Sequence, residues 1–301
     1  AISLGLEPGE FGVGEASYAT ISPSLISDVY PAARRNNALT IFYVAIPVGA
    51  ALGNILGGWV AMHGTWRLAF LWAGAPGLLL ALVLLPFAEP RRGASDPAAP
   101  AERKPGWRDV LRLFGIPSYL LVVLGYTAYT FAQGGFGHWA PAFLEEVHGL
   151  PTDTAGLFFG GTLVVSGLVG TMLGGLVATA WQKRNPAGYA LMMGLSVLLS
   201  VPLAFLAFAV QGRAACMAAL AGAIFLTFLS TGPTNTLILE TVPVNLRASA
   251  MALSIFMIHL FGDMWSPLLV GRLADHGGLG RAVMILPIAL LVVLGLLYGA
   301  L

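Results

Sequence analysis

Long apolar segments separated by short polar turns run along almost the whole chain. A helix needs about 20 mostly apolar residues to cross the hydrocarbon core of a bilayer, and nine segments meet this requirement. They cover residues 10–29, 37–62, 66–87, 118–143, 153–181, 187–210, 214–241, 247–273 and 281–301. The pattern therefore predicts an all-α membrane protein in which each segment is a transmembrane helix.

The largest interruption of this pattern lies at residues 88–117, which are rich in Pro, Ala and charged residues, as in a flexible linker. Its last part, "WRDVLRLF", separates apolar from charged residues on two helical faces: Trp107, Val110, Leu111 and Phe114 on one, and Arg108, Asp109 and Arg112 on the other. This predicts a short helix on the membrane surface. The alternative is that these residues are the first turns of the next span, although Pro117 favours a break.

Basic residues indicate the orientation, because cytoplasmic loops retain Lys and Arg. One set of alternate loops holds eleven of the 15 basic residues, namely Arg34, Arg35, Arg91, Arg92, Arg103, Lys104, Arg108, Arg112, Lys183, Arg184 and Arg247. The other set holds Arg67, Arg213, Arg272 and Arg281. We therefore expect the linker to be cytoplasmic and residue 1 to lie outside. The composition resembles that of bacterial proteins, which would place the chain in a bacterial inner membrane.

Composition excludes several classes of function. The chain is 57% hydrophobic and 10% charged, whereas soluble domains are roughly 25% charged. A net charge of +1 without a basic stripe argues against nucleic-acid binding. The single cysteine, Cys216, excludes an intrachain disulfide and a cysteine metal cluster. No Gly-x-Ser-x-Gly or His-Glu-x-x-His motif is present, so we expect neither an enzyme nor a cofactor.

A repeat relates the two parts of the chain. The segments "DVYPAARRNNA" (28–38) and "ETVPVNLRASA" (240–250) both read acid, two residues, Pro, three residues, Arg, two residues, Ala, at an offset of 212. Tandem halves are typical of secondary transporters, whose substrate site lies between the halves. The span that ends at Glu240 is the fourth after the linker, so by the repeat three helices are expected before Phe11.

The chain accordingly divides into three parts. We expect residues 1–88 to be the remainder of an N-terminal bundle (helices four to six), 89–117 to be a cytoplasmic linker with a short amphipathic helix, and 118–301 to be a C-terminal six-helix bundle.

Six plus six spans around a central cytosolic loop resemble the major facilitator superfamily. Within it, the chain is similar to the Spinster family in the stretches "GVGEASYATISPSLISDVYP", "ALTIFYVAIPVGAALGNILGGW" followed by "WRLAF", and "FAQGGFGHWAPAFL". The resemblance implies nine of twelve helices of that fold and proton-driven transport, by alternating access, of an amphipathic lipid such as a lysophospholipid or sphingoid phosphate. A carrier of small organic acids or drugs is the alternative. We expect a monomer whose partners are protons, this substrate and membrane lipids.

Glu15 is an ionisable residue inside the first apolar segment. A charged group at mid-membrane costs about 2.5 to 3.5 kcal/mol on insertion scales, so it usually faces a cavity and has a function there. We predict that Glu15 takes up and releases the coupling proton. The alternative is a carboxyl that is bound to a neighbouring helix for packing. The resemblance implies that its counterpart lies on the expected preceding helices.

A second pair of titratable residues lies in the eighth segment, where His259, Asp263 and Ser266 share one helical face at i, i+4 and i+7. His259 and Asp263 could relay a proton or bind a polar head group. A structural hydrogen-bonded pair and, remotely, an intramembrane catalytic pair are the alternatives. Two ligands without a third do not make a metal site.

Polar stripes on other segments suit the wall of a substrate cavity. The fourth segment carries Tyr126, Tyr129, Thr130 and Gln133, the seventh carries Thr227, Thr231, Thr234 and Asn235, and Tyr18 lies near Glu15. Hydrogen bonding between helices explains such residues equally well.

Two further groups suggest how the helices move. Gly49, Gly53 and Gly57 follow Pro47 at four-residue spacing, which predicts close helix packing, with a gating bend at Pro47 as the alternative. At the cytoplasmic ends, Asp28 with Arg35 and Glu240 with Arg247 are predicted to form latch pairs that break between access states. Since exposed pairs contribute little energy, their value would lie in switching.

Overall fold

The computed structural model is helical, and in the part of the chain that it describes (residues 8–63, 66–86, 88, 94–95 and 106–300) no strand occurs. The first part contains α1 (Pro8–Val29), α2 (Ala32–His63) and α3 (Trp66–Leu84). The second begins with α4 (Trp107–Leu111), η1 (Arg112–Gly115), α5 (Pro117–Glu146), α6 (Thr152–Val165), η2 (Ser166–Gly170) and α7 (Thr171–Gln182). It continues with α8 (Gly188–Ala209), α9 (Arg213–Phe228), α10 (Thr231–Glu240), η3 (Val244–Leu246) and α11 (Arg247–Met257). It ends with η4 (Ile258–Asp263), α12 (Ser266–Gly277), α13 (Leu279–Ala282) and α14 (Ile285–Ala300).

Every predicted apolar segment coincides with a helix or a run of consecutive helices. Among the described residues, four runs are long and apolar enough to cross a membrane: Thr152–Gln182, Gly188–Ala209, Arg213–Glu240 and Val244–Gly277. A fifth is added if α5 is counted together with the preceding Trp107–Gly115, from which it is bent by 84°. The helical class is confirmed, and the count of nine spans stays a prediction.

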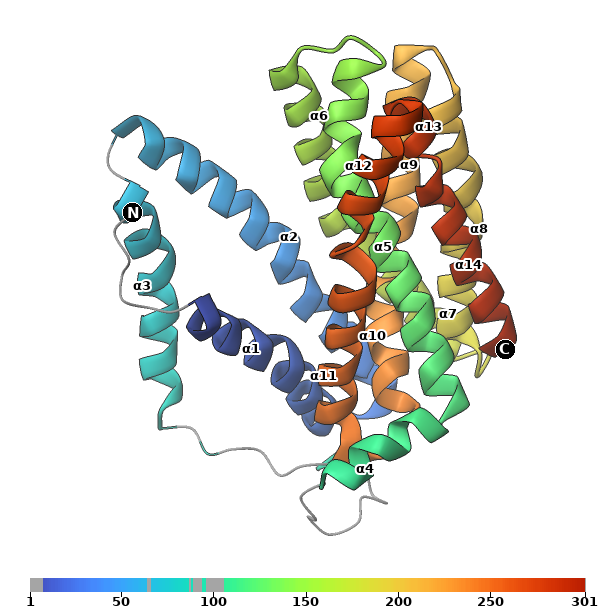
Figure 1. Ribbon diagram of the computed structural model, residues 1–301. Coiled ribbons are helices and arrows are strands. Elements are labelled where there is room, and N and C mark those ends of the chain that lie inside the picture. The colour runs from blue at the N-terminus through green and yellow to red at the C-terminus, as the bar shows by residue number, and fades with distance from the viewer. Residues whose placement is uncertain (1–7, 64–65, 87, 89–93, 96–105, 301) are drawn as a thin grey trace.

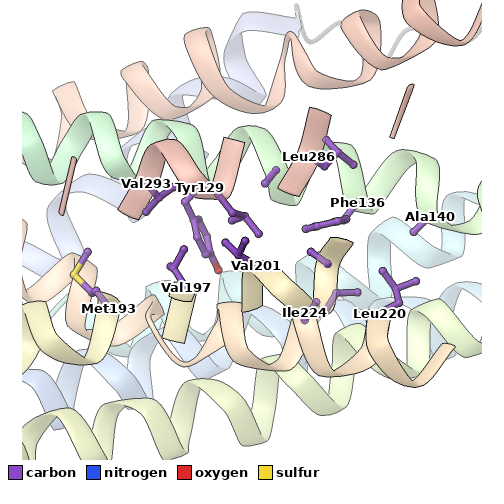
Figure 2. Packing of buried hydrophobic residues seen from close by; sticks show 14 of the residues in the cluster. Tyr129, Phe136, Ala140, Met193, Val197, Val201, Leu220, Ile224, Leu286 and Val293 are labelled. Carbon is purple, nitrogen blue, oxygen red and sulfur yellow. The ribbon is translucent and has the colours of Figure 1, made fainter. Parts of the chain in front are cut away.

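Most of the hydrophobic core lies in the second part (Figure 2), where α5, α8, α9 and α14 pack together, and Leu39 and Tyr43 of α2 join it. Phe208 of α8 is its aromatic centre: its ring stacks on Phe136 at 5.8 Å and meets the edge of Phe143 at 5.0 Å. Small residues such as Ala132 and Ala204 are fully buried nearby. Aromatic rings alternating with alanines allow these helices to interlock at short distance.

Glycines bring other helices of this part into backbone contact. A Cβ atom on Gly174 of α7 would overlap the backbone of Leu229, and one on Gly134 of α5 would lie 2.7 Å from Cβ of Asp263. Gly134 thus lets α5 touch η4, which is a π-helical segment. A second π-helical segment, η2, interrupts the α6–α7 run. Such bulges often occur at functional sites.

The first part converges with the second at one end of the molecule and diverges at the other (Figure 1). At the converging end, which we call the closed end, α1 packs along α11, and α2 packs along α7 and α10. The end of α1, the start of α2, and α4 all lie there. At the opposite, open end, α2 leans away from the second part.

This divergence leaves Gly49 and Gly53 of α2 without close neighbours in the second part. A Cβ atom on Gly49 or Gly53 would have nothing within 4 Å, and Gly57 lies outside the residues whose surroundings are described. Gly49 and Gly53 therefore make no close contact with the described residues, because α2 leaves the second part beyond Pro47, and close packing at these glycines stays a prediction. Pro47 itself is the tight contact, since a Cβ on Gly167 of η2 would lie 2.5 Å from Cβ of Pro47.

Candidate functional site

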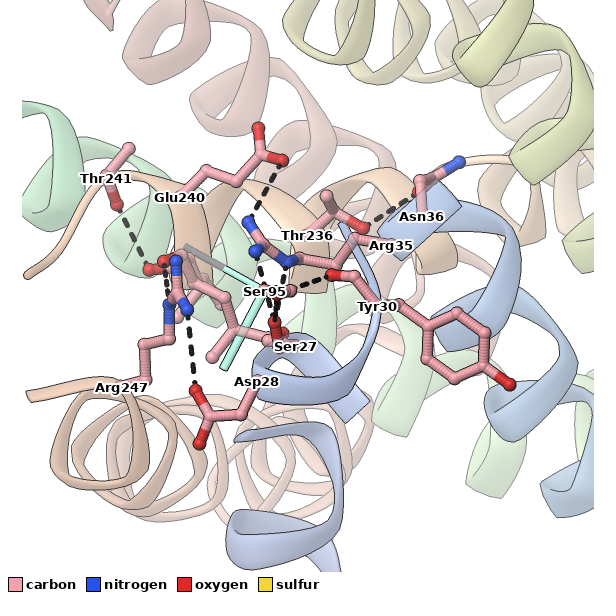
Figure 3. A network of polar contacts seen from close by, with 12 residues as sticks. Ser27, Asp28, Tyr30, Arg35, Asn36, Ser95, Thr236, Glu240, Thr241 and Arg247 are labelled. Atoms are coloured by element: carbon pink, nitrogen blue, oxygen red, sulfur yellow. Dashed lines mark hydrogen bonds and ion pairs between the residues drawn. The ribbon is translucent and has the colours of Figure 1, made fainter. Parts of the chain in front are cut away.

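Two ion pairs cross between the parts at the closed end (Figure 3). Nη1 of Arg35 lies 3.7 Å from Oε1 of Glu240, and Nη1 of Arg247 lies 3.5 Å from Oδ1 of Asp28. The sequence analysis pairs each arginine with the acid of its own loop and expects exposed pairs. The structure corrects the exposure, since all side chains except that of Glu240 are at most 5% exposed, and it shows pairs that join opposite parts.

The repeat explains how each arginine is held. Nε and Nη2 of Arg35 donate to the Ser27 carbonyl at 3.2 and 3.1 Å, and Nε of Arg247 donates to the Leu239 carbonyl at 3.2 Å. Ser27 and Leu239 are themselves related by the 212-residue offset. Each guanidinium therefore caps the end of its own preceding helix and reaches the carboxylate of the other part. Arg offers five donors in a planar fork, which suits both tasks at once.

Asn36 is a buried connection that the sequence analysis did not single out. Its Nδ2 donates to the Gly175 carbonyl at 2.7 Å and to Oγ1 of Thr179 at 2.9 Å, and Oγ1 of Thr236 donates to its Oδ1 at 2.8 Å. One amide thus joins α2 to α7 and α10. The sequence signal was an asparagine two residues after Arg34 at the start of an apolar segment, where an amide needs partners.

The linker also reaches the closed end. The backbone N–H of Ser95 donates to the Asp28 carbonyl at 2.9 Å, and its hydroxyl lies 3.1 Å from the Ser27 carbonyl and 3.0 Å from the Tyr30 carbonyl. The predicted flexible linker is therefore attached to the end of α1 at this point. Residues 96–105 lie outside the described residues.

A pocket of about 480 Å³ opens at the same end, beside the crossed ion pairs. It is lined by Ala32, Ala33, Arg35, Thr179, Gln182, Lys183, Tyr189, Glu240 and Arg247. Both halves contribute to its wall, so a relative movement of the halves changes its shape.

An aromatic cluster lies between the two parts, further from the closed end. The rings of Tyr18 (α1) and Phe42 (α2) are 5.1 Å apart, and Phe42 meets the edge of Tyr43 at 5.1 Å. Tyr43 interacts electrostatically with Tyr18 and with Tyr126 of α5. The predicted cavity residues Tyr18 and Tyr126 are thus brought together by Tyr43, which the sequence analysis missed because it lies in a continuous apolar run.

Tyr126 extends this cluster into the second part. It lies near Asn235 of α10 and Asp263 of η4. Its ring centre lies 5.9 Å from that of Tyr129. The cluster therefore contacts five segments with few charged groups, an arrangement suited to a mainly apolar molecule with a small polar head.

Several other predicted cavity residues are occupied by bonds within or between helices. Three donate to the carbonyl four residues earlier: Thr130 to Tyr126, Thr234 to Ser230 and Asn235 to Thr231. Tyr129 donates to the Thr227 carbonyl, and Gln133 donates to the Tyr129 hydroxyl. Thr234 and Asn235 are also buried. For the buried Thr234 the structural alternative fits best, whereas Tyr126, Thr130, Gln133 and Thr231 remain partly exposed.

His259 and Asp263 form the predicted contact. Nδ1 of His259 lies 2.9 Å from Oδ2 of Asp263, and the two side chains are 63% and 33% exposed. Ser266, the third residue of the predicted face, is buried and donates to the Asp263 carbonyl at 3.4 Å, so it does not extend the pair. The pair lies in the π-helical segment η4.

Glu15 lies on α1, and its side chain is outside the described residues. Among the residues that are described, no group of three His, Cys, Asp or Glu side chains could hold a metal ion.

Comparison with known proteins places the chain in a family. The sequence profile of the Major Facilitator Superfamily matches residues 11–267. Among curated proteins, spinster homolog 1 of Homo sapiens is 36% identical over 302 residues, covering 90% of this chain and 55% of the human protein. The probable sphingolipid transporter spinster homolog 2 of Arabidopsis thaliana is 31% identical, and the match covers 88% of this chain and 57% of the plant protein. The chain spans about half the length of these relatives.

Solved structures share the fold. A bacterial homolog of the human lysosomal transporter Spinster, in an inward-facing and unoccupied conformation, superposes with a TM-score of 0.59 at 24% identity, over 93% of this chain and 73% of that one. The transporter FucP in its outward conformation superposes with a TM-score of 0.73 at 15% identity, over 94% and 72%. The chain belongs to the major facilitator superfamily of membrane transporters, and its curated relatives are spinster homologs.

Proposed function

We propose that the chain is part of a proton-coupled secondary transporter that moves an amphipathic, lipid-like substrate by alternating access. The observation that carries the proposal is the pair of crossed, buried ion pairs at the closed end, opposite an end at which α2 diverges from the second part. A carrier that exposes its site to one side at a time needs contacts of this kind, which can break and re-form.

The arrangement corresponds to an outward-facing state if the closed end is cytoplasmic, as the distribution of basic residues predicts. The higher TM-score to FucP in its outward conformation than to the inward-facing Spinster homolog supports this assignment. In the opposite state, the ion pairs of Arg35 and Arg247 would separate. The protein would work as a monomer in a bacterial inner membrane.

The aromatic cluster supports a lipid-like substrate. Tyr18, Tyr43 and Tyr126 present rings and hydroxyls, with Asp263 as the nearby acid. Apolar and aromatic walls with a few polar groups are typical of sites for drug-sized and amphipathic ligands. The similarity to a plant protein described as a probable sphingolipid transporter favours sphingoid phosphates or lysophospholipids.

Proton coupling is assigned to Glu15 and to the His259–Asp263 pair. The 2.9 Å contact in η4 joins an imidazole to a carboxylate, two side-chain types that can form a proton relay. Asp263 also lies near Tyr126, so a change of its charge would be felt at the substrate cluster.

The test is flux into proteoliposomes that contain the full chain and carry an imposed pH gradient. Fluorescent lysophosphatidylethanolamine, sphingosine phosphate and a small organic acid are compared, and lipids in the outer leaflet are removed with albumin. Gradient-dependent movement of either lipid supports the proposal. Movement of the organic acid alone would favour the carrier of small organic acids or drugs, and lipid movement that ignores the gradient would contradict proton coupling.

A further inference from the structure

The nine-residue helical stretch Trp107–Gly115, which we call the interfacial helix, has three distinct faces. Trp107, Leu111 and Phe114 are 70%, 52% and 50% exposed. At 100° per residue they fall within one sector of about 60°. Three large apolar side chains on one face of so short a helix are unfavourable in contact with water, so an apolar partner is expected to cover them.

The second face is basic and lies beside the first. Arg108 and Arg112 are one turn apart, both exposed, about 100° around the helix from Trp107 and Leu111. Arg108 also lies over the Trp107 ring, 5.6 Å from its centre. Positive charge thus borders the apolar face along its length.

The third face attaches the helix to the protein. Leu113 is fully buried in the core, and Asp109 is 7% exposed. Asp109 accepts a hydrogen bond from the Gly106 N–H at 3.0 Å and lies 3.1 Å from Nη1 of Arg112. The sequence analysis places Asp109 on the charged face with the arginines, and this is corrected: the acid points inward, so the exposed charge is basic.

The direction of the helix fixes what the exposed faces meet. It is bent by 84° from α5 at Ile116, whose extended backbone precedes Pro117. The base of α5 is held by the buried Tyr119 hydroxyl, which donates to the Ala250 carbonyl of α11 at 2.9 Å. Because α5 runs along the second part (Figure 1), a helix perpendicular to it lies in the plane of the membrane surface.

From these four observations we infer that the interfacial helix is a binding surface for anionic phospholipid head groups, with Trp107, Leu111 and Phe114 among the acyl chains and Arg108 and Arg112 at the phosphates. An apolar face sinks into the boundary between head groups and chains, and bordering basic residues favour anionic over zwitterionic lipid. The inference does not depend on the transported substrate.

The test measures quenching of Trp107 in bilayers that contain the full chain. Phosphatidylglycerol or phosphatidylcholine carries a spin label near its head group, and the signal of Trp107 is the difference between the chain and its Trp107→Phe variant. We expect quenching by labelled phosphatidylglycerol to exceed that by labelled phosphatidylcholine several-fold, because basic residues near the surface favour anionic lipid. Arg108→Gln with Arg112→Gln should remove this preference and keep quenching by phosphatidylcholine.

The matched control is Arg272→Gln with Arg281→Gln, which removes the same charge from two exposed positions elsewhere. It should keep the preference for phosphatidylglycerol. Equal quenching by both lipids in the unmodified chain would overturn the inference. So would strong quenching of Trp107 by aqueous iodide in bilayers, because that would place the helix in water. Thermal unfolding of each variant verifies that it is folded.

Discussion

Among the arginines whose side chains the structure describes, Arg247 and Arg35 are buried, and each has two tasks. Arg247 holds the Leu239 carbonyl and the Asp28 carboxylate together, with its side chain 5% exposed. Loss of one partner of a buried ion pair leaves an uncompensated buried charge, so the stability of the closed end requires both partners in place. The closed end therefore depends on the fork shape of arginine as well as on its charge.

Replacing Arg247 by Lys tests this dependence. The ammonium group cannot reach both acceptors, so Arg247→Lys should lower the free energy of unfolding by about 1–3 kcal/mol. Arg34→Lys is the matched control, since Arg34 is exposed in the same repeat, and it should change stability by less than about 0.5 kcal/mol. Thermal unfolding in detergent compares them. Equal stability of both variants would contradict a special role for Arg247.

Glu15 makes a separate prediction for transport. Glu15→Gln keeps the size of the side chain and removes its proton equilibrium. It should therefore abolish flux driven by a pH gradient while exchange of substrate for substrate continues. Both rates are measured in proteoliposomes with labelled substrate. A variant that still responds to the gradient would remove Glu15 from the coupling mechanism and leave the His259–Asp263 pair as the candidate.

At the scale of elements, glycines decide which helices touch. Gly174 allows α7 to meet the backbone at Leu229, and Gly134 allows α5 to meet Asp263 in η4. In contrast, Gly49 and Gly53 face open space, although their spacing is the more regular. A glycine pattern in a sequence thus gives the capacity for close approach, and the path of the neighbouring helix determines whether it is used.

Alanine substitution separates the two situations. Gly174→Ala forces a Cβ atom against backbone that cannot move easily, and it should destabilise the protein by about 1–3 kcal/mol. Gly160→Ala is its control, because Gly160 on α6 has nothing within 4 Å. It should be neutral or stabilising by up to about 1 kcal/mol, since Ala favours helix more than Gly does. Unfolding temperatures of both variants give the comparison, and a reversed order would refute the contact.

At the scale of the whole molecule, the polar bridges described above join the two parts at one end. Arg35–Glu240, Arg247–Asp28 and the bonds of Asn36 all lie there, and all link segments more than 130 residues apart. Rigid-body movement of the parts would break them together, which is the expected behaviour of a two-state switch.

Distances between spin labels can test this switch. Cysteines replace the exposed Arg34 and Arg184 in a Cys216→Ala background, which removes the single native cysteine. Asp28→Asn and Arg247→Gln should each populate a longer distance between the labels. The double variant should add little to the larger single effect, because both substitutions break the same ion pair.

Asp153→Asn serves as the control in that experiment. Asp153 is exposed at the start of α6, outside the closed end. The distance between the spin labels in Asp153→Asn should therefore have the same distribution as in the protein without this substitution. Identical distributions in all variants would mean that the crossed pairs do not hold the closed end together.

The apolar pattern determined the helical class, the approximate helix limits and the break before Pro117, because a bilayer demands about 20 apolar residues per span and hydrogen bonding within each segment. The repeat located Asp28, Arg35, Glu240 and Arg247, and helical spacing alone brought His259 to Asp263, since both are local properties of the chain. The partners of the arginines, the bridging by Asn36, the joining of Tyr18 to Tyr126 by Tyr43 and the inward turn of Asp109 were decided by tertiary structure. These contacts depend on how helices far apart in sequence are placed against one another, and periodicity within one helix carries no information about its neighbour.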